Sequence, residues 1–197
     1  MDSEPRHDAR RRLRRADWER AALGAIARGG LNAVAVEPLA RELGVTKGSF
    51  YAHFATRDDL LEAALARWEA EHDAASLAAL AAGDDAPARL QALVDAAVAF
   101  AEGAGPSPHL ALLGEVHDPR VRAALQRVNA SRMAYLAGLY GELGLPPARA
   151  RDRAQLAYAT FLGLLQLARE GEGGRRTVRQ QRALAREVAG ALRPADS

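Results

Sequence analysis

The chain has 197 residues, of which 49% are hydrophobic and 26% are charged. This composition suits one compact core with a smaller subdomain, and it excludes a collagen-like repeat or a chain too polar to collapse. Cysteine is absent, which excludes disulfides, zinc–thiolate sites, iron–sulfur clusters and a cysteine nucleophile. No apolar signal-peptide segment follows the basic start, so we expect a cytoplasmic protein.

The net charge of +2 is distributed unevenly along the chain. Up to Arg57, ten arginines and Lys47 oppose seven acidic residues, a balance of +4, whereas the remainder carries −2. A basic first quarter is typical of a surface that faces a polyanion. A general preference for arginine explains the same asymmetry, so charge alone leaves both interpretations open.

Helical periodicity recurs along the chain and alternating β-branched runs are absent, which predicts an all-α fold. The first helix is expected at about 12–28, with arginines on its exposed side, and ends at Gly29 and Gly30. The second is expected at about 36–43 and ends at Gly44.

A third, very short helix is expected after Thr46, whose hydroxyl can accept a backbone N–H of the first turn. Phe50 and Phe54 then share one face of the chain. A long fourth helix is expected to start with the capping-box pair Thr56 and Asp59 and to run toward residue 80.

Proline, glycine and capping residues, among them Asp118 as the cap before Pro119, divide the second half into further helices. Their expected positions are about 87–103, 109–116, 119–143, a helix from Pro147 that includes 154–168, and an amphipathic helix at 178–192 with Val178 on its apolar stripe. The segment 154–168 is apolar nearly all round but is shorter than the roughly 20 residues of a membrane span. We therefore expect no membrane partner and a helix that is buried on several faces.

Two helices joined by a short glycine-containing turn, the second very short and polar at its start, form a helix-turn-helix pattern. Such a second helix enters the major groove of DNA, where small or extended polar side chains reach base edges and neighbouring groups bind phosphate. The candidate contacts to DNA are Lys47, Gly48, Ser49, Tyr51, His53 and Arg57.

The segment 16–65, above all GVTKGSFYAHFATRDDLL after LAREL, resembles the DNA-binding head of the TetR family of bacterial transcriptional regulators. The resemblance implies that Thr46 joins the contacts of the recognition helix and that Arg57 binds phosphate. One departure is Ala35, which opens the second helix where the family usually has a threonine that caps the helix and contacts phosphate.

The resemblance further implies a helix-turn-helix domain at 1–57 and a helical ligand-binding and dimerisation domain at 58–197, with about nine helices in all. It implies a homodimer through the last two helices, a near-palindromic operator of double-stranded DNA and a small-molecule effector. The basic arm is a further candidate for DNA contact; its arginines are Arg6, Arg10, Arg11, Arg12, Arg14 and Arg15.

Polar or aromatic residues on apolar helix faces are candidates for lining an effector pocket. They are Trp68, Phe100, His109, His117, Tyr135, Tyr158, Phe161 and Gln166, with His72 as either a pocket residue or a solvated helix residue. A DNA-binding regulator without a small-molecule ligand, or an activator with the same head, remains an alternative to a ligand-released repressor.

A helical metalloenzyme is the remaining alternative. A di-metal helical site needs two Glu-x-x-His motifs and two further carboxylates, whereas Glu69 and His72 form one such motif and Glu115 and His117 are only two residues apart. No GxSxG, HExxH or phosphate-binding glycine loop is present. We therefore expect no enzyme activity, no bound metal and no cofactor.

Overall fold

The computed structural model describes residues 13–73, 77–78, 81–103, 106–170 and 176–194. Over these ranges the fold is all-α, as predicted, with nine α-helices and one short 3-10 helix, η1. The elements are α1 (Arg15–Gly29), η1 (Leu31–Ala33), α2 (Val36–Glu42), α3 (Lys47–Tyr51), α4 (Arg57–Glu71), α6 (Ala86–Gly103), α7 (Pro108–Leu113), α8 (Pro119–Glu142), α9 (Pro147–Glu170) and α10 (Val178–Leu192). None of these helices is long and apolar enough to cross a membrane.

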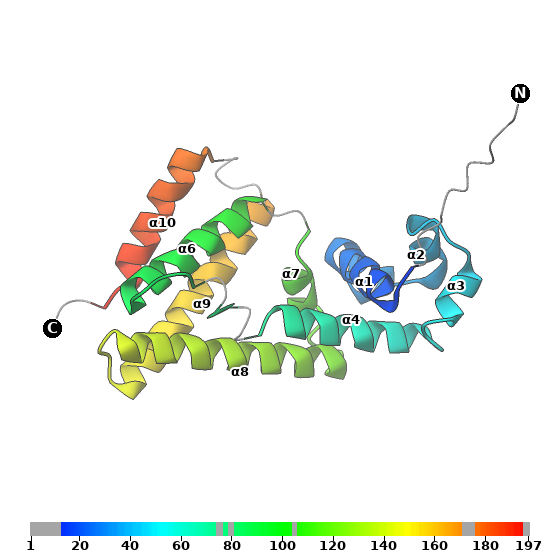
Figure 1. The fold of residues 1–197 in the computed structure, drawn as a ribbon, viewed down its shortest axis with the longest axis horizontal. Coiled ribbons are helices and arrows are strands. Elements are labelled where there is room, and N and C mark those ends of the chain that lie inside the picture. Colours follow the sequence, from blue (N-terminus) through cyan, green and yellow to red (C-terminus); the bar gives the residue numbers. More distant parts are fainter. Residues whose placement is uncertain (1–12, 74–76, 79–80, 104–105, 171–175, 195–197) are drawn as a thin grey trace, which may run out of the picture.

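Helices α1, α2 and α3 form a small head that packs on the start of α4 (Figure 1). Its centre is aromatic: the Trp18 and Phe50 rings meet edge to face at 5.4 Å, and the Phe50 and Phe54 rings stack at 5.6 Å. All three side chains are buried. Because α3 has only five residues, this aromatic anchoring, rather than helix propensity, holds it in place.

Several predicted helix caps are present, and one is wrong. Thr56 Oγ1 accepts the Asp59 N–H at 3.1 Å, and the Asp118 carboxylate accepts the Arg120 N–H at 2.8 Å, each at the start of a long helix. The Thr46 hydroxyl, in contrast, makes no capping bond. The Ser49 N–H bonds instead to the Thr46 carbonyl at 3.0 Å, so the turn before α3 is closed by backbone alone.

Helix α4 ends at Glu71, well before the predicted end near residue 80. The reason is the side chain of His72, whose Nδ1–H donates to the Trp68 carbonyl at 2.8 Å. In a continuing helix that carbonyl would receive the backbone N–H of residue 72. This N–H bonds instead to the Glu69 carbonyl at 3.1 Å, which tightens the last turn and stops the helix.

Helices α4 and α8 run side by side and connect the head to a body built from α6, α9 and α10 (Figure 1). Three arginines on α8 face α4. Arg120 Nη1 lies 3.4 Å from Asp58 Oδ1, and Arg127 Nε lies 2.6 Å from Glu69 Oε1. The Arg132 Nε–H donates to the His72 carbonyl at 3.1 Å. The contacting residues follow one another from 58 to 72 on the α4 side and from 120 to 132 along α8, so the two helices run parallel.

Helix α9 is covered on one side only within the chain, so the burial on several faces expected from its sequence would need a further covering element such as a partner subunit. Only Ala150, Ala154 and Leu165 of this helix are buried. Leu156 and Leu167 are 49% and 51% exposed, because α6 and α8 cover the opposite side. Val178 was also expected on the buried face of the last helix, but it lies in the first turn of α10 and is 63% exposed.

The loop after α7 contacts the head directly. Glu115 Oε1 accepts the backbone N–H of Leu31, the first residue of η1, at 3.1 Å. Gly30 has φ +68°, and a Cβ placed there would overlap the Glu115 carboxylate. The glycine is therefore required both by its left-handed backbone and by the close approach of the body.

We predict that Gly30→Ala destabilises the protein more than Gly44→Ala. Both glycines have positive φ, but space around Gly44 is open. Gly44→Ala should therefore lower the free energy of unfolding only by the cost of a left-handed alanine backbone, about 1–2 kcal/mol. Gly30→Ala should lose roughly 1–3 kcal/mol more, since the Leu31 N–H loses its charged acceptor. Urea unfolding at equal protein concentration measures both; equal losses would contradict a stabilising Glu115–Leu31 bond.

Candidate DNA interface and ligand cavity

Helix α3 presents an exposed polar surface held from behind by Phe50. Thr46, Lys47 and Gly48 are exposed at its start, and Tyr51 is 58% exposed at its end. Ser49 is half-buried on the same helix. The structure thus places Lys47, Gly48, Ser49 and Tyr51 on one helix with an aromatic support beneath it, whereas Thr46 precedes this helix, His53 follows it and Arg57 begins α4.

Lys47 is paired with Glu37 of α2. Its Nζ lies 3.0 Å from Glu37 Oε1, and both side chains are exposed. The hydrogen bond and the charge of the partner raise the pKa of Lys47 and lower that of Glu37. An exposed ion pair of this kind contributes little to stability, so Lys47 can exchange Glu37 for another acceptor at low cost.

Arg15 fixes α1 to the turn between α3 and α4. Its Nη1–H donates to the His53 carbonyl at 3.1 Å, and its guanidinium lies 4.3 Å from the centroid of the Phe54 ring. The sequence suggested Arg15 as part of a basic arm, but its partners lie within the head. Residues 1–12, which carry the rest of that arm apart from Arg14, lie outside the described residues.

Arg57 has an intrachain role that the sequence did not reveal. Its Nε–H donates to the Val34 carbonyl and an Nη2–H donates to the Leu31 carbonyl, both at 2.6 Å. Its Nη1 also faces Asp58 at 3.2 Å. The guanidinium therefore ties the first turn of α4 to the segment between α1 and α2. A phosphate contact by Arg57 stays a prediction, with fewer N–H groups left to make it.

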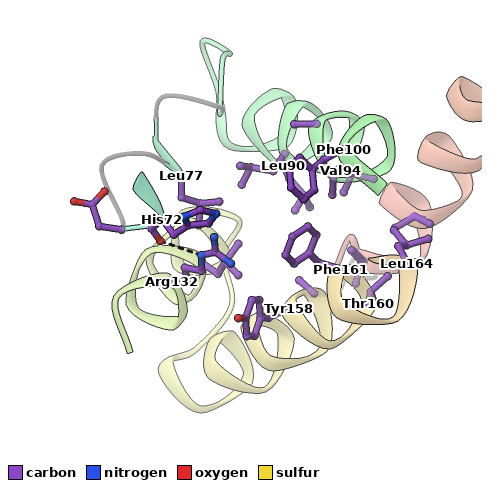
Figure 2. A pocket seen from close by; sticks show the side chains of 18 of the residues that line it. His72, Leu77, Leu90, Val94, Phe100, Arg132, Tyr158, Thr160, Phe161 and Leu164 are labelled. Atoms are coloured by element: carbon purple, nitrogen blue, oxygen red, sulfur yellow. Dashed lines mark hydrogen bonds between the residues drawn. The ribbon is translucent and has the colours of Figure 1, made fainter. Parts of the chain in front are cut away.

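A cavity of about 330 Å³ lies in the body between the end of α4 and helices α6, α8, α9 and α10 (Figure 2). Its walls are mainly aliphatic and aromatic, including Leu90, Phe100 and Phe161. His72 and Arg132 stand together at one end, where the Arg132 Nε–H bonds to the His72 carbonyl. An apolar cavity with a few convergent polar groups is the usual form of a small-molecule site.

Comparison with known proteins bears on the head through a family model and on the overall fold through solved structures. The family model described as "Bacterial regulatory proteins, tetR family" matches residues 20–64, which contain the helix-turn-helix. The chain is a TetR-family DNA-binding transcriptional regulator. No curated protein matches the chain.

Solved structures share the fold of this TetR-family chain over nearly its whole length. A putative transcriptional regulator from Pseudomonas aeruginosa is 20% identical with a TM-score of 0.71, covering 96% of each chain. The reduced form of Escherichia coli NemR is 19% identical with a TM-score of 0.71, covering 93% of this chain and 99% of its own. A TetR transcriptional regulator from Legionella pneumophila is 15% identical with a TM-score of 0.70, covering 95% and 98%. At these identities the likeness concerns the fold alone.

Three of the predicted pocket residues of this TetR-family protein line the cavity, namely Phe100, Tyr158 and Phe161. Trp68 and His109 are buried behind the wall: the His109 ring lies 5.6 Å from Trp68 and 6.2 Å from Tyr158.

The other three predicted pocket residues lie elsewhere. His117 is exposed beside Glu115 at 3.5 Å. Tyr135 is half-buried against the core of the body, and Gln166 is exposed and bonds to Glu170. A stripe at helical spacing indicates which face of a helix turns inward but not how deeply each residue is buried, so the sequence could not separate these three residues from those that line the cavity.

Two cavity residues were not assigned by the sequence. His72 was open between pocket and solvent; it lines the cavity, and burial lowers its pKa. Arg132 was missed, because an arginine in a long amphipathic helix is usually a surface residue. It is only 8% exposed, and the hydrophobic pattern carried no signal for it.

A neutral polar network supports one wall of the cavity. The Tyr158 hydroxyl donates to Asn129 Oδ1 at 2.8 Å, and His109 Nε2 lies 3.1 Å from the same hydroxyl oxygen. Because the Tyr158 hydroxyl donates its only proton to Asn129, it can only accept a hydrogen bond from His109, so the His109 ring carries its proton on Nε2. Burial first, and the charge of Arg132 second, lower the pKa of His109 to about 3, so the ring is neutral at pH 7.

Potential metal ligands are used in other contacts. Glu69 pairs with Arg127, His72 bonds to the Trp68 carbonyl, and Glu115 accepts the Leu31 N–H. Among the residues with described positions, no three histidine or carboxylate side chains gather as a metal site.

We predict that His109 makes the stability of this regulator fall at acidic pH. Its folded pKa of about 3 lies below the ordinary imidazole value of 6.5. Below pH 6.5 the ring therefore binds a proton in the unfolded chain but stays neutral in the folded one, and stability is lost as the pH falls toward 3. The loss approaches roughly 1 kcal/mol per pH unit. Urea unfolding from pH 7 to about pH 4 should give a shallower decline for His109→Phe, with His117→Phe as matched control. Parallel curves for His109→Phe and the native protein would contradict this.

Proposed function

We propose that this TetR-family protein is a homodimeric repressor that binds a near-palindromic operator and is released from it by a small molecule in the cavity. The observation that carries this proposal is the position of α4. Its last turn forms part of the cavity wall, and its first turn holds the head through Arg57. An operator in a bacterial cell places the protein in the cytoplasm.

The proposed DNA contacts are made by α3 and its flanks. Lys47 exchanges Glu37 for a guanine edge or a phosphate, and Gly48 lets the backbone approach the groove. Tyr51 and His53 meet the sugar–phosphate backbone, while Thr46 and Ser49 complete the polar surface. The remaining N–H groups of Arg57 bind phosphate. This assignment is supported by the exposure of Lys47 and Tyr51 on the element that Phe50 anchors.

The proposed dimer forms through α9 and α10. The outer side of α9 carries Leu156 and Leu167, both about half exposed, and α10 is amphipathic. Two copies of these helices would bury such a surface in a four-helix contact about a two-fold axis. The axis would hold two recognition helices about one DNA turn apart, roughly 34–36 Å.

Release by a ligand follows from differential binding. A molecule that binds the cavity better in one arrangement of α4 shifts the protein toward that arrangement. Through Arg57, a shift of α4 changes the position of the head and the separation of the two recognition helices. The cavity supports this proposal over a regulator without a ligand, for which a filled body would be expected.

We predict that Lys47→Ala with Tyr51→Ala weakens operator binding by about 100-fold, since two direct contacts are lost. The operator is first located by footprinting on the DNA that flanks the gene, at several salt concentrations. Circular dichroism and sedimentation should be unchanged in the variant. Arg89→Ala, which removes one positive charge from the body, is the control and should retain affinity.

Unchanged affinity in the double variant would overturn the assignment of α3. A protected near-palindrome supports the dimer, and transcription from the bound promoter should rise when the gene is deleted. A fall in transcription on deletion would mark an activator instead.

We predict that Leu156→Glu with Leu167→Glu converts the dimer to a monomer, because charges replace the apolar groups that α9 presents to the partner. Val116→Glu is the matched control, since Val116 is exposed to a similar degree but lies between α7 and α8. Sedimentation velocity measures the outcome. A dimer that survives both α9 substitutions would contradict this interface.

A further inference from the structure

We propose that the effector is an amphipathic carboxylic acid whose carboxylate pairs with Arg132 and whose hydrocarbon part fills the rest of the cavity. This inference rests on the proposed function, in that it assigns the effector to the same cavity. It adds the chemical class of the ligand and the residue that selects it.

Arg132 is the one permanently positive side chain among the described residues that line the cavity. Only 8% of it is exposed. Its Nε–H donates to the His72 carbonyl, and its guanidinium lies 5.7 Å from the Tyr158 ring centroid and 5.8 Å from that of Phe161. Within the described residues it forms no ion pair with a carboxylate.

A guanidinium that is buried without a counter-ion is costly, and a charge partner in an apolar cavity is worth more than in water. Arginine presents its N–H groups as a planar fork that a carboxylate matches with two parallel hydrogen bonds. A ligand carboxylate would therefore supply the negatively charged partner that the Arg132 guanidinium lacks within the described residues.

The other polar groups of the cavity limit the ligand to a single negative charge. Burial lowers the pKa of His72, so its ring adds no positive charge at neutral pH, and the Thr160 hydroxyl donates to the Leu156 carbonyl at 2.9 Å. Glu71 lines the same end but pairs with Arg67 at 2.7 Å, and Asp73 has an interaction of its own. Because Arg132 supplies one positive charge and both carboxylates already have partners, this end of the cavity suits a monoanion, whereas Glu71 and Asp73 would repel the second negative charge of a phosphate.

The rest of the cavity is hydrocarbon in character. Figure 2 shows Arg132 and His72 at one end, with Phe100, Val94 and Leu164 toward the other. The volume of about 330 Å³ suits a small lipophilic ligand. A molecule with an acid at one end and an alkyl or aryl body satisfies both ends at once.

The test is isothermal titration calorimetry of the full-length protein, without DNA, with decanoate, decanol and decylammonium below their micelle concentrations. Decanoate should bind about 10- to 100-fold more tightly than decanol, the range expected for a charged hydrogen bond, and decylammonium should bind no better than decanol. Decanoate that binds no tighter than decanol, or does not bind, overturns the proposal without any variant.

The variants are Arg132→Met, Arg132→Lys and the matched control Arg127→Met on the same helix. Arg132→Met should abolish the preference for decanoate while decanol still binds, and Arg132→Lys should retain part of it. Circular dichroism verifies folding. Equal decanoate affinity in Arg132→Met and Arg127→Met would overturn the role of Arg132.

The same three compounds are then added to the protein on its operator. Decanoate that binds without releasing DNA supports the ligand class and contradicts ligand-released repression. Decylammonium that binds preferentially and releases DNA overturns the ligand class and leaves the proposed function standing.

Discussion

Helix α4 is held at both ends by the guanidinium group of an arginine, and the arrangement of head and body depends on this. At its start, Arg57 binds two carbonyls of the segment before α2 at 2.6 Å. At its end, Arg132 of α8 binds the carbonyl of His72. Arginine suits this task because its planar fork donates several hydrogen bonds and keeps its charge when buried. The helix thereby becomes a stiff connection between the cavity and the surface of α3.

The two arginine contacts differ in what else they can bind. Arg57 is committed to backbone carbonyls and an adjacent carboxylate, so its contribution is mainly to the position of the head. Arg132 lies in an apolar cavity with one N–H used on His72 and no ion pair within the described chain. A ligand that binds Arg132 acts directly on the last turn of α4. In this way the proposed effector class and the proposed release mechanism depend on the same bond, although separate measurements test them.

Sequence reasoning succeeded where local chemistry sets the structure. Capping at Thr56 and Asp118, the short α3 with its Phe50 and Phe54 pair, and the division of the body into helices follow from interactions between residues close in sequence. It failed where a local signal competed with a longer-range one. The Thr46 hydroxyl has the chemistry of a cap but the backbone closes the turn, and α4 ends nine residues early because the His72 side chain takes a helix carbonyl.

The sequence by itself determined the all-α class and, through the residues around Lys47 and Tyr51, a helix-turn-helix that resembles TetR regulators. These features repeat at helical spacing or lie within one short segment, so they can be read without knowing what packs against them. Only the tertiary structure decided that Arg132 is buried in a cavity, that His109 lies behind its wall, and that one side of α9 is left exposed. Burial depends on which helices pack together although they lie far apart in the sequence. A periodic pattern identifies the apolar face of a helix but not the helix that packs against it.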